Sequence, residues 1–145
     1  MTIQFANCYG RISFKGVGTN HAPADTPQKI VDFDTEISSD GVTGSHAANT
    51  ITINSAGAYK VFLQLNALVS DDETYTLYLA VNDQEAGSIP IDIERKTGVL
   101  SFMASGFVQN LSVADELSLY VSSTDAGGAD FTPSFLEIDV FKVGT

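Results

Sequence analysis

The stretch that decides the fold class is residues 59–66, which read Tyr59-Lys60-Val61-Phe62-Leu63-Gln64-Leu65-Asn66. Large apolar residues stand at every second position, and polar residues fill most of the positions between them. Successive side chains of a β-strand point to opposite faces of the sheet, so this two-residue period predicts a strand with one face in the core. Phe62 departs from the pattern because it places an aromatic ring on the face opposite the core set.

The same alternation recurs along the rest of the chain. We expect further strands at residues 75–81, 117–121 and 136–140, and shorter ones at Ile12/Phe14, Val31/Phe33, Ile51/Ile53, Ile89–Ile93, Leu100–Ala104 and Phe107–Leu111. Turn-forming residues separate these segments, and no segment has the spacing of an amphipathic helix. The stretch Gly16–Gln28 contains two prolines and no apolar rhythm, so we predict a loop there. The pattern predicts an all-β protein: an antiparallel β-sandwich, a jelly roll of about 8–10 strands.

Length and charge limit the class of protein further. The 145 residues predict a single domain covering 1–145. The net charge of −11, with scattered basic residues, disfavours binding to nucleic acid or to an anionic membrane surface. No stretch has the ~20 apolar residues of a membrane span. The first residues lack the basic start and apolar run of a signal peptide, so we expect the protein to be made in the cytoplasm.

The sequence offers no catalytic constellation. It has one cysteine, Cys8, which excludes an intrachain disulfide, and two histidines, His21 and His46, both expected in solvated loops. The paired carboxylates Asp32/Asp34 are expected to face solvent. The run Asp71-Asp72-Glu73 has oxygen ligands suited to calcium but lacks the alternating ligand spacing, so we interpret it as a hairpin tip. We therefore expect no enzyme, catalytic residue, resident metal or cofactor.

The order of motifs from Thr50 onward resembles the tumour-necrosis-factor and complement-globular-head jelly-roll family. The segment Thr50–Val61 is similar to that family's strand, Ala-Gly turn and aromatic-led strand, and Leu77–Asp83 to its strand followed by Asn and a small turn. The early segment Tyr9–Phe14 resembles the first strand of phage-encoded members of this fold. The chain departs from the family by having Ala114-Asp115 where Gly-Asp is usual, and by showing no collagen-like repeat, coiled-coil stalk or secretion signal.

The resemblance implies a homotrimer, because members of this family pack their inner sheets around a three-fold axis and place aromatic residues there. Phe62, Tyr120 and Phe141 each stand opposite the core set of their strand, and we predict them as the trimer interface. The alternative is that local β-bulges turn these rings into the core.

These observations favour a non-enzymatic structural virion protein. In this hypothesis a homotrimeric jelly roll decorates or cements a phage capsid at the virion surface, with the major capsid protein or another virion protein as its partner. The alternative is a receptor-binding or fibre-tip domain that recognises a cell-surface glycan or protein. A secreted cytokine-like ligand ranks below both.

Residues 1–8 are a candidate attachment segment. Ile3 and Phe5 alternate in a way that suits addition of a strand to a sheet edge of the partner. The alternative is that they begin the trimer's own first strand.

Overall fold

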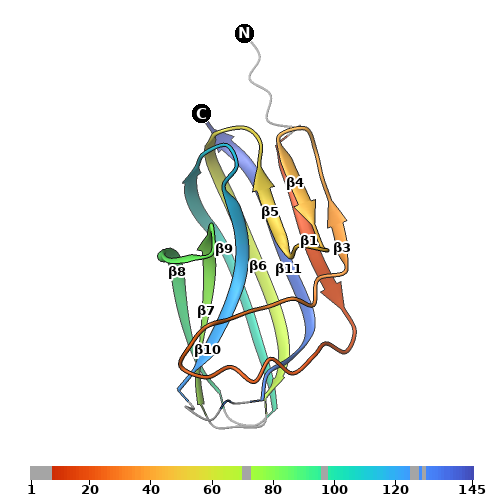
Figure 1. Cartoon of the computed structure of the whole chain (residues 1–145), viewed down its shortest axis with the longest axis vertical. Helices are drawn as coiled ribbons and strands as arrows, with labels where there is room; N and C mark the ends of the chain where they lie inside the picture. Colours follow the sequence, from red (N-terminus) through yellow and green to blue (C-terminus); the bar gives the residue numbers. More distant parts are fainter. Residues whose placement is uncertain (1–7, 70–72, 96–97, 125–127, 129) are drawn as a thin grey trace.

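The computed structural model describes residues 8–69, 73–95, 98–124, 128 and 130–145, and in these residues the chain is built of strands without a helix (Figure 1). The strands are β1 (Tyr9–Lys15), β2 (Gln28–Lys29), β3 (Thr35–Ile37), β4 (Val42–Ser45), β5 (Thr50–Ile53), β6 (Gly57–Val69), β7 (Glu73–Val81), β8 (Gln84–Arg95), β9 (Gly98–Leu111), β10 (Glu116–Ser123) and β11 (Thr132–Gly144). Within the described residues, no helix is long and apolar enough to cross a membrane.

The strands form two antiparallel sheets. The first has five strands in the order β3-β1-β11-β6-β9. The second has the order β4-β5-β10-β7-β8, with β2 paired to β10. The two sheets lie face to face, as Figure 1 shows, so the predicted antiparallel sandwich of jelly-roll type is confirmed.

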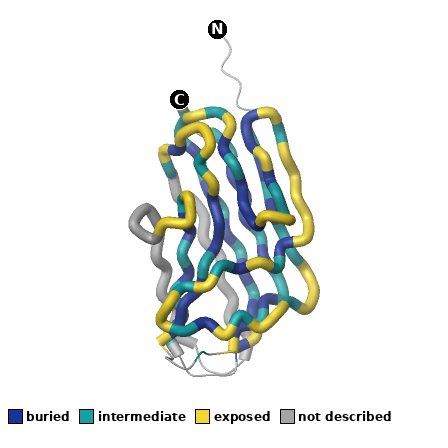
Figure 2. The backbone as a smooth tube through the Cα atoms, viewed as in Figure 1, coloured by how far each residue is buried: buried dark blue, intermediate teal, exposed yellow. Residues whose placement is uncertain are grey.

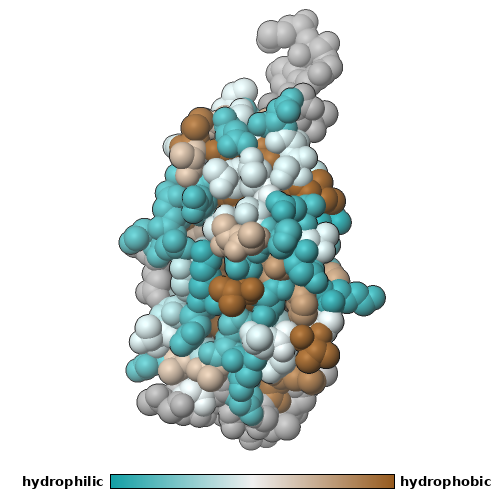
Figure 3. All heavy atoms as spheres, turned by 45° about the vertical axis from the view of Figure 1, so that its right-hand side comes forward, coloured by the Kyte–Doolittle hydropathy of each residue, from teal (hydrophilic) through white to brown (hydrophobic). Residues whose placement is uncertain are grey.

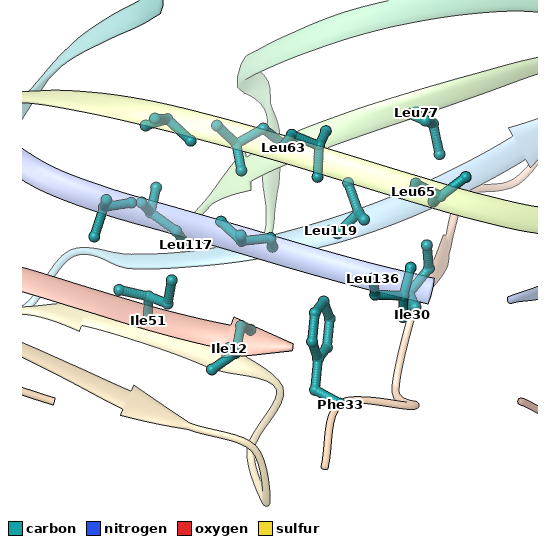
Figure 4. Packing of buried hydrophobic residues seen from close by; sticks show 14 of the residues in the cluster. Ile12, Ile30, Phe33, Ile51, Leu63, Leu65, Leu77, Leu117, Leu119 and Leu136 are labelled. Atoms are coloured by element: carbon teal, nitrogen blue, oxygen red, sulfur yellow. The ribbon is translucent and has the colours of Figure 1, made fainter. Parts of the chain in front are cut away.

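The core lies between the sheets and contains the side chains that the alternation selects. Along β6, Tyr59, Val61, Leu63 and Leu65 are each at most 1% exposed. Figure 4 shows leucines of β6 and β11 meeting Leu77, Leu117 and Leu119 of the other sheet. Burying one such side chain contributes roughly 1.5–3 kcal/mol, so alternating strands gain most of their stability from this packing.

The predicted loop after β1 is confirmed, and it extends beyond the predicted end. Only β2 interrupts residues 16–34, which cross the lower half of one face of the sandwich in Figures 1 and 2. The predicted short strand at Val31/Phe33 is wrong. Ile30 and Phe33 are buried there, but their backbone N–H groups donate to Leu119 O at 2.8 Å and Asn49 Oδ1 at 3.2 Å instead of forming a ladder.

The boundary predicted between residues 104 and 107 is also wrong, because one continuous strand, β9, covers both predicted strands. The pairing of β9 with β6 shifts register between Val61 and Leu63, opposite Phe107 and Ala104. A bulge of this kind lets two alternation patterns of different phase occur in a single strand.

Candidate functional site

The outer face of the five-stranded sheet has an aromatic pair on two inner strands, β6 and β11. Phe62 of β6 and Phe141 of β11 stack with ring centroids 5.5 Å apart and planes 18° from parallel. Both are partly buried although they face away from the core. Ile37 and Leu68 follow the same alternation and are 43% and 55% exposed. This sheet therefore presents apolar surface on the side that an isolated sandwich would keep polar.

A polar cluster lies beside this aromatic pair. Asp139, only 8% exposed, accepts a hydrogen bond from Tyr9 Oη at 2.9 Å and one from Arg11 Nε. Arg11 Nε also lies 3.5 Å from Glu137 Oε1. Burial, followed by the hydrogen bond and charge of Asp139, raises the pKa of Glu137. The carboxylates are thus held by local partners, whereas the phenylalanine rings, among the side chains of this face that the structure describes, contact each other.

The third predicted interface residue, Tyr120, is not with the other two. It lies on the outer face of the second sheet, where its hydroxyl donates to Asp83 Oδ1 at 2.8 Å. Burial, followed by the bond to Asp83, raises the pKa of Tyr120 to about 12. The structure therefore brings Phe62 and Phe141 together and places Tyr120 on the opposite side of the sandwich.

Asp83 reaches Tyr120 because of the turn between β7 and β8. Asn82 and Asp83 have φ values of 55° and 58°, as a two-residue type I′ hairpin requires. The side chain of Asn82 ties this turn to β10, since it accepts from Glu116 N at 2.9 Å and its amide donates to Asp115 Oδ1 at 2.9 Å. The turn thus holds the Asp83 carboxylate over the second sheet.

A surface hollow of about 380 Å³ lies beside this turn. Its lining includes Tyr78, Tyr120, Ala80, Asp83 and the Thr26-Pro27 segment of the long loop. Tyr78 stands directly opposite Tyr120 in the β7–β10 ladder, and Ala80 stands opposite Ser118. The pair Tyr78 and Tyr120 is bulky, whereas the neighbouring pair Ala80 and Ser118 is small. The surface is therefore lower over the small pair, and this difference in size forms the hollow. Sequence reasoning missed Tyr78, although its position between Leu77 and Leu79 is the signal that singled out Tyr120.

His21 and His46 each lie beside a carboxylate. His21 was expected in solvent, and this expectation is wrong, because its side chain is 5% exposed and Nε2 lies 3.3 Å from Asp32 Oδ2. Asp32, expected to face solvent, is 7% exposed and accepts from Thr19 Oγ1 at 2.8 Å. The long loop folds back on the sandwich and encloses both. His46 lies at the surface, with Nδ1 2.7 Å from Glu36 Oε1.

Two predicted features fall outside the described part of the chain. Ile3 and Phe5 of the candidate attachment segment belong to residues 1–7, and Asp71 and Asp72 of the candidate calcium run belong to residues 70–72. Among the residues that the structure does describe, no group of three His, Cys, Asp or Glu side chains is placed to hold a metal ion.

Figure 3 shows a face on which apolar residues form small separate patches among polar ones. Large apolar side chains that are exposed elsewhere include Val17, Val31, Val113 and Val143, which come from different segments. The stacked pair and the tyrosine hollow are both surface features with a defined geometry in the part of the chain that the structure describes.

Comparison with known proteins identifies the fold. The chain matches no protein-family model and has no significant match among curated protein sequences. Among solved structures it is similar to Eiger TNF from S. frugiperda (16% identity, TM-score 0.59), with 94% of each chain covered. It is also similar to the globular domain of the zebrafish complement 1qA protein (12% identity, TM-score 0.57), with 94% of this chain and 97% of that one covered. Murine APRIL is a third (13% identity, TM-score 0.58), with 93% and 99% covered. The chain therefore has the TNF/C1q-like jelly-roll fold over nearly its full length.

Proposed function

We propose that this protein is a non-enzymatic structural protein that works as a homotrimer, and that the trimer decorates or cements a phage capsid. The observation that carries the assembly step is the stack of Phe62 on Phe141 on the outer face of the five-stranded sheet. Two further exposed apolar side chains, Ile37 and Leu68, share that face. Covering it with two other copies of the chain removes this surface from water, which is the dominant driving force for association.

The likeness in fold to Eiger TNF, complement 1qA and APRIL supports a jelly roll that functions through protein contacts. The proposal that the protein belongs to a virion rests on the resemblance of Tyr9–Phe14 to the first strand of phage-encoded members of this fold. Under this proposal, the partner is the major capsid protein or another virion protein. A net charge of −11 keeps many copies soluble and mutually repelling at the particle surface.

Two measurements test this proposal. Light scattering across a dilution series should give a mass of three times the 15.4 kDa chain. A mass of one subunit at every concentration contradicts the trimer. Co-sedimentation of the purified protein with phage particles that lack it should then show saturable binding to the shell. Binding to the tail alone, or to neither, contradicts the capsid role.

Deletion of residues Met1–Phe5 locates the attachment surface. If Ile3 and Phe5 add a strand to the partner, the truncated protein keeps its trimeric mass and loses particle binding. A truncated protein that fails to fold instead assigns these residues to the trimer's own first strand. If the truncated trimer still binds particles, residues Met1–Phe5 are not part of the attachment surface.

A second candidate function is supported by the hollow at Tyr78 and Tyr120. A receptor-binding or fibre-tip domain needs a recessed surface that remains free when the trimer forms. The hollow lies on the sheet opposite the stacked phenylalanines, so this sheet stays exposed in the proposed trimer. Binding to host cells, with no binding to particles, would favour this candidate over the capsid role.

A further inference from the structure

We infer that the hollow between β7, β10 and the Thr26-Pro27 segment is a binding site for the end of a neutral saccharide. The inference gives a ligand class to the receptor-binding candidate, and it does not depend on trimer formation. The volume of the hollow, about 380 Å³, falls within the range of roughly 300–1,000 Å³ that is typical of small-ligand sites.

The hollow combines ring surface with hydrogen-bonding groups. Tyr78 and Tyr120 are direct partners in the β7–β10 ladder, so their Cβ atoms lie about 4.5–5.5 Å apart, and both rings line the hollow. Each ring also carries a hydroxyl, as does Thr26 on the other side of the hollow. A sugar ring has the complementary surface, with C–H groups on one face and hydroxyls around its edge. Tyrosine suits such a ligand because one end of its side chain is apolar and the other polar.

The Asp83 carboxylate is positioned and ionised. Tyr120 Oη donates to its Oδ1 at 2.8 Å, Ser118 Oγ donates at 3.3 Å, and Lys29 Nζ lies 3.6 Å away. The bond from Tyr120 is the largest of the effects that lower the pKa of Asp83, and the charge of Lys29 adds to it. An ionised carboxylate only accepts hydrogen bonds, so the ligand must supply donors, which sugar hydroxyls do.

The charge of the region selects a neutral ligand. The chain carries a net charge of −11, which repels anionic ligands such as phosphates or sialylated glycans. The site also has little excess charge to attract a cation, because Lys29 lies close to Asp83. The side chains of Asp83 and Lys29 are 52% and 27% exposed, so a ligand can reach both.

The site is built before a ligand arrives. The type I′ turn fixes Asp83, Asn82 anchors that turn to β10, and Tyr120 is bonded to Asp83. A ligand that binds to such a preformed surface loses less free energy to the ordering of protein side chains. In a trimer three copies would bind a multivalent glycan with higher avidity than a single sugar.

The test is saturation-transfer NMR and calorimetry of the full chain with the methyl glycosides of glucose, galactose, mannose and N-acetylglucosamine at millimolar concentration. We expect at least one of them to bind, and a sialyl glycoside to bind more weakly. Tyr78→Ala should weaken binding roughly tenfold or more, because it removes half of the ring surface. Tyr120→Phe should weaken it several-fold, since Asp83 loses the hydrogen bond that holds it.

Tyr9→Phe is the matched control. It removes a phenol hydroxyl that donates to a carboxylate, Asp139, on the opposite sheet, and should leave sugar affinity unchanged. Absence of binding by all four glycosides overturns the inference, and so does binding that Tyr78→Ala leaves unchanged. A lysine-rich peptide that binds more tightly than any sugar and contacts Tyr78 shows that the hollow takes a cation instead. The mass of each variant is measured separately, so a failed sugar site and a failed trimer are distinguishable.

Discussion

Replacing Phe62 with glutamate should dissociate the proposed trimer, whereas the same replacement at Tyr120 should not. Sequence alternation assigned both residues to one interface, but the structure places Phe62 on the five-stranded sheet and Tyr120 on the other. The side chain of Phe62 contacts Phe141 within each subunit, and its outer surface would meet the neighbouring subunits. Phe62→Glu therefore puts one carboxylate per subunit close to the three-fold axis.

The size of the effect follows from the desolvation of these charges. An unpaired buried charge costs several kcal/mol, and we use about 3 kcal/mol per subunit, or about 9 kcal/mol for the trimer. Each 1.4 kcal/mol is tenfold in an equilibrium constant, so the association constant falls by roughly six powers of ten. For a monomer–trimer equilibrium, the concentration of half-dissociation changes with the square root of that constant. It should rise by roughly three powers of ten.

The assay is light scattering or sedimentation velocity of both variants over a micromolar dilution series, with circular dichroism to verify folding. Phe62→Ala is the milder comparison. It removes the ring without adding a charge, so it loses the stack, worth about 0.5–1.5 kcal/mol per subunit, together with the apolar contact of the ring, and it should lower the melting temperature of a protein that is still trimeric. A folded Phe62→Glu protein that remains trimeric at the lowest concentration refutes the reasoning. Dissociation by Tyr120→Glu but not by Phe62→Glu would move the interface to the second sheet.

Three further predictions concern the sandwich itself. Gly44→Ala should destabilise the fold by several kcal/mol in a urea titration, because its Cβ would lie 2.7 Å from Arg11 O and 2.8 Å from Ile37 O, both backbone atoms; an unchanged midpoint contradicts this packing. Burial is the main cause that raises the pKa of Tyr59 to about 12 from 10.0, so this residue contributes stability below pH 10 that is lost as the pH rises toward 12. Tyr59→Phe should remove that part of the alkaline loss, about 2–3 kcal/mol, in denaturant titrations between these pH values. Burial and Asp139 raise the pKa of Glu137 above its ordinary 4.5, so its stabilising contribution is present below pH 4.5 and lost as the pH rises through the raised pKa. Glu137→Gln should therefore melt at a higher temperature than the parent protein at pH 7, with a smaller difference at pH 4; a lower melting temperature at pH 7 would show that the pairing of Glu137 with Arg11 dominates.

The sequence by itself determined the fold class and most of the core. The information is local in the sequence, because the side-chain period of a strand is two. A single stretch such as residues 59–66 is therefore enough to predict which of its side chains are buried. The residues so selected in β6 and β10, from Tyr59 to Leu65 and from Leu117 to Val121, are buried as expected. Alternation also identified Phe62, Tyr120 and Phe141 as facing away from the core; none of the three belongs to the buried core, although a register shift with β9 does occur at Phe62.

Only the tertiary structure decided which outward residues share a surface. Alternation gives the face of each strand, but the order of strands depends on contacts between segments far apart in sequence, such as the β6–β11 pairing that brings Phe62 to Phe141. The same order separates Tyr120 from them and places it beside Tyr78. Asp83 reaches Tyr120 only because two residues with positive φ reverse the chain at that point. His21 and Asp32 are buried because a loop without periodicity folds over the core, and a loop carries no local pattern that states its burial.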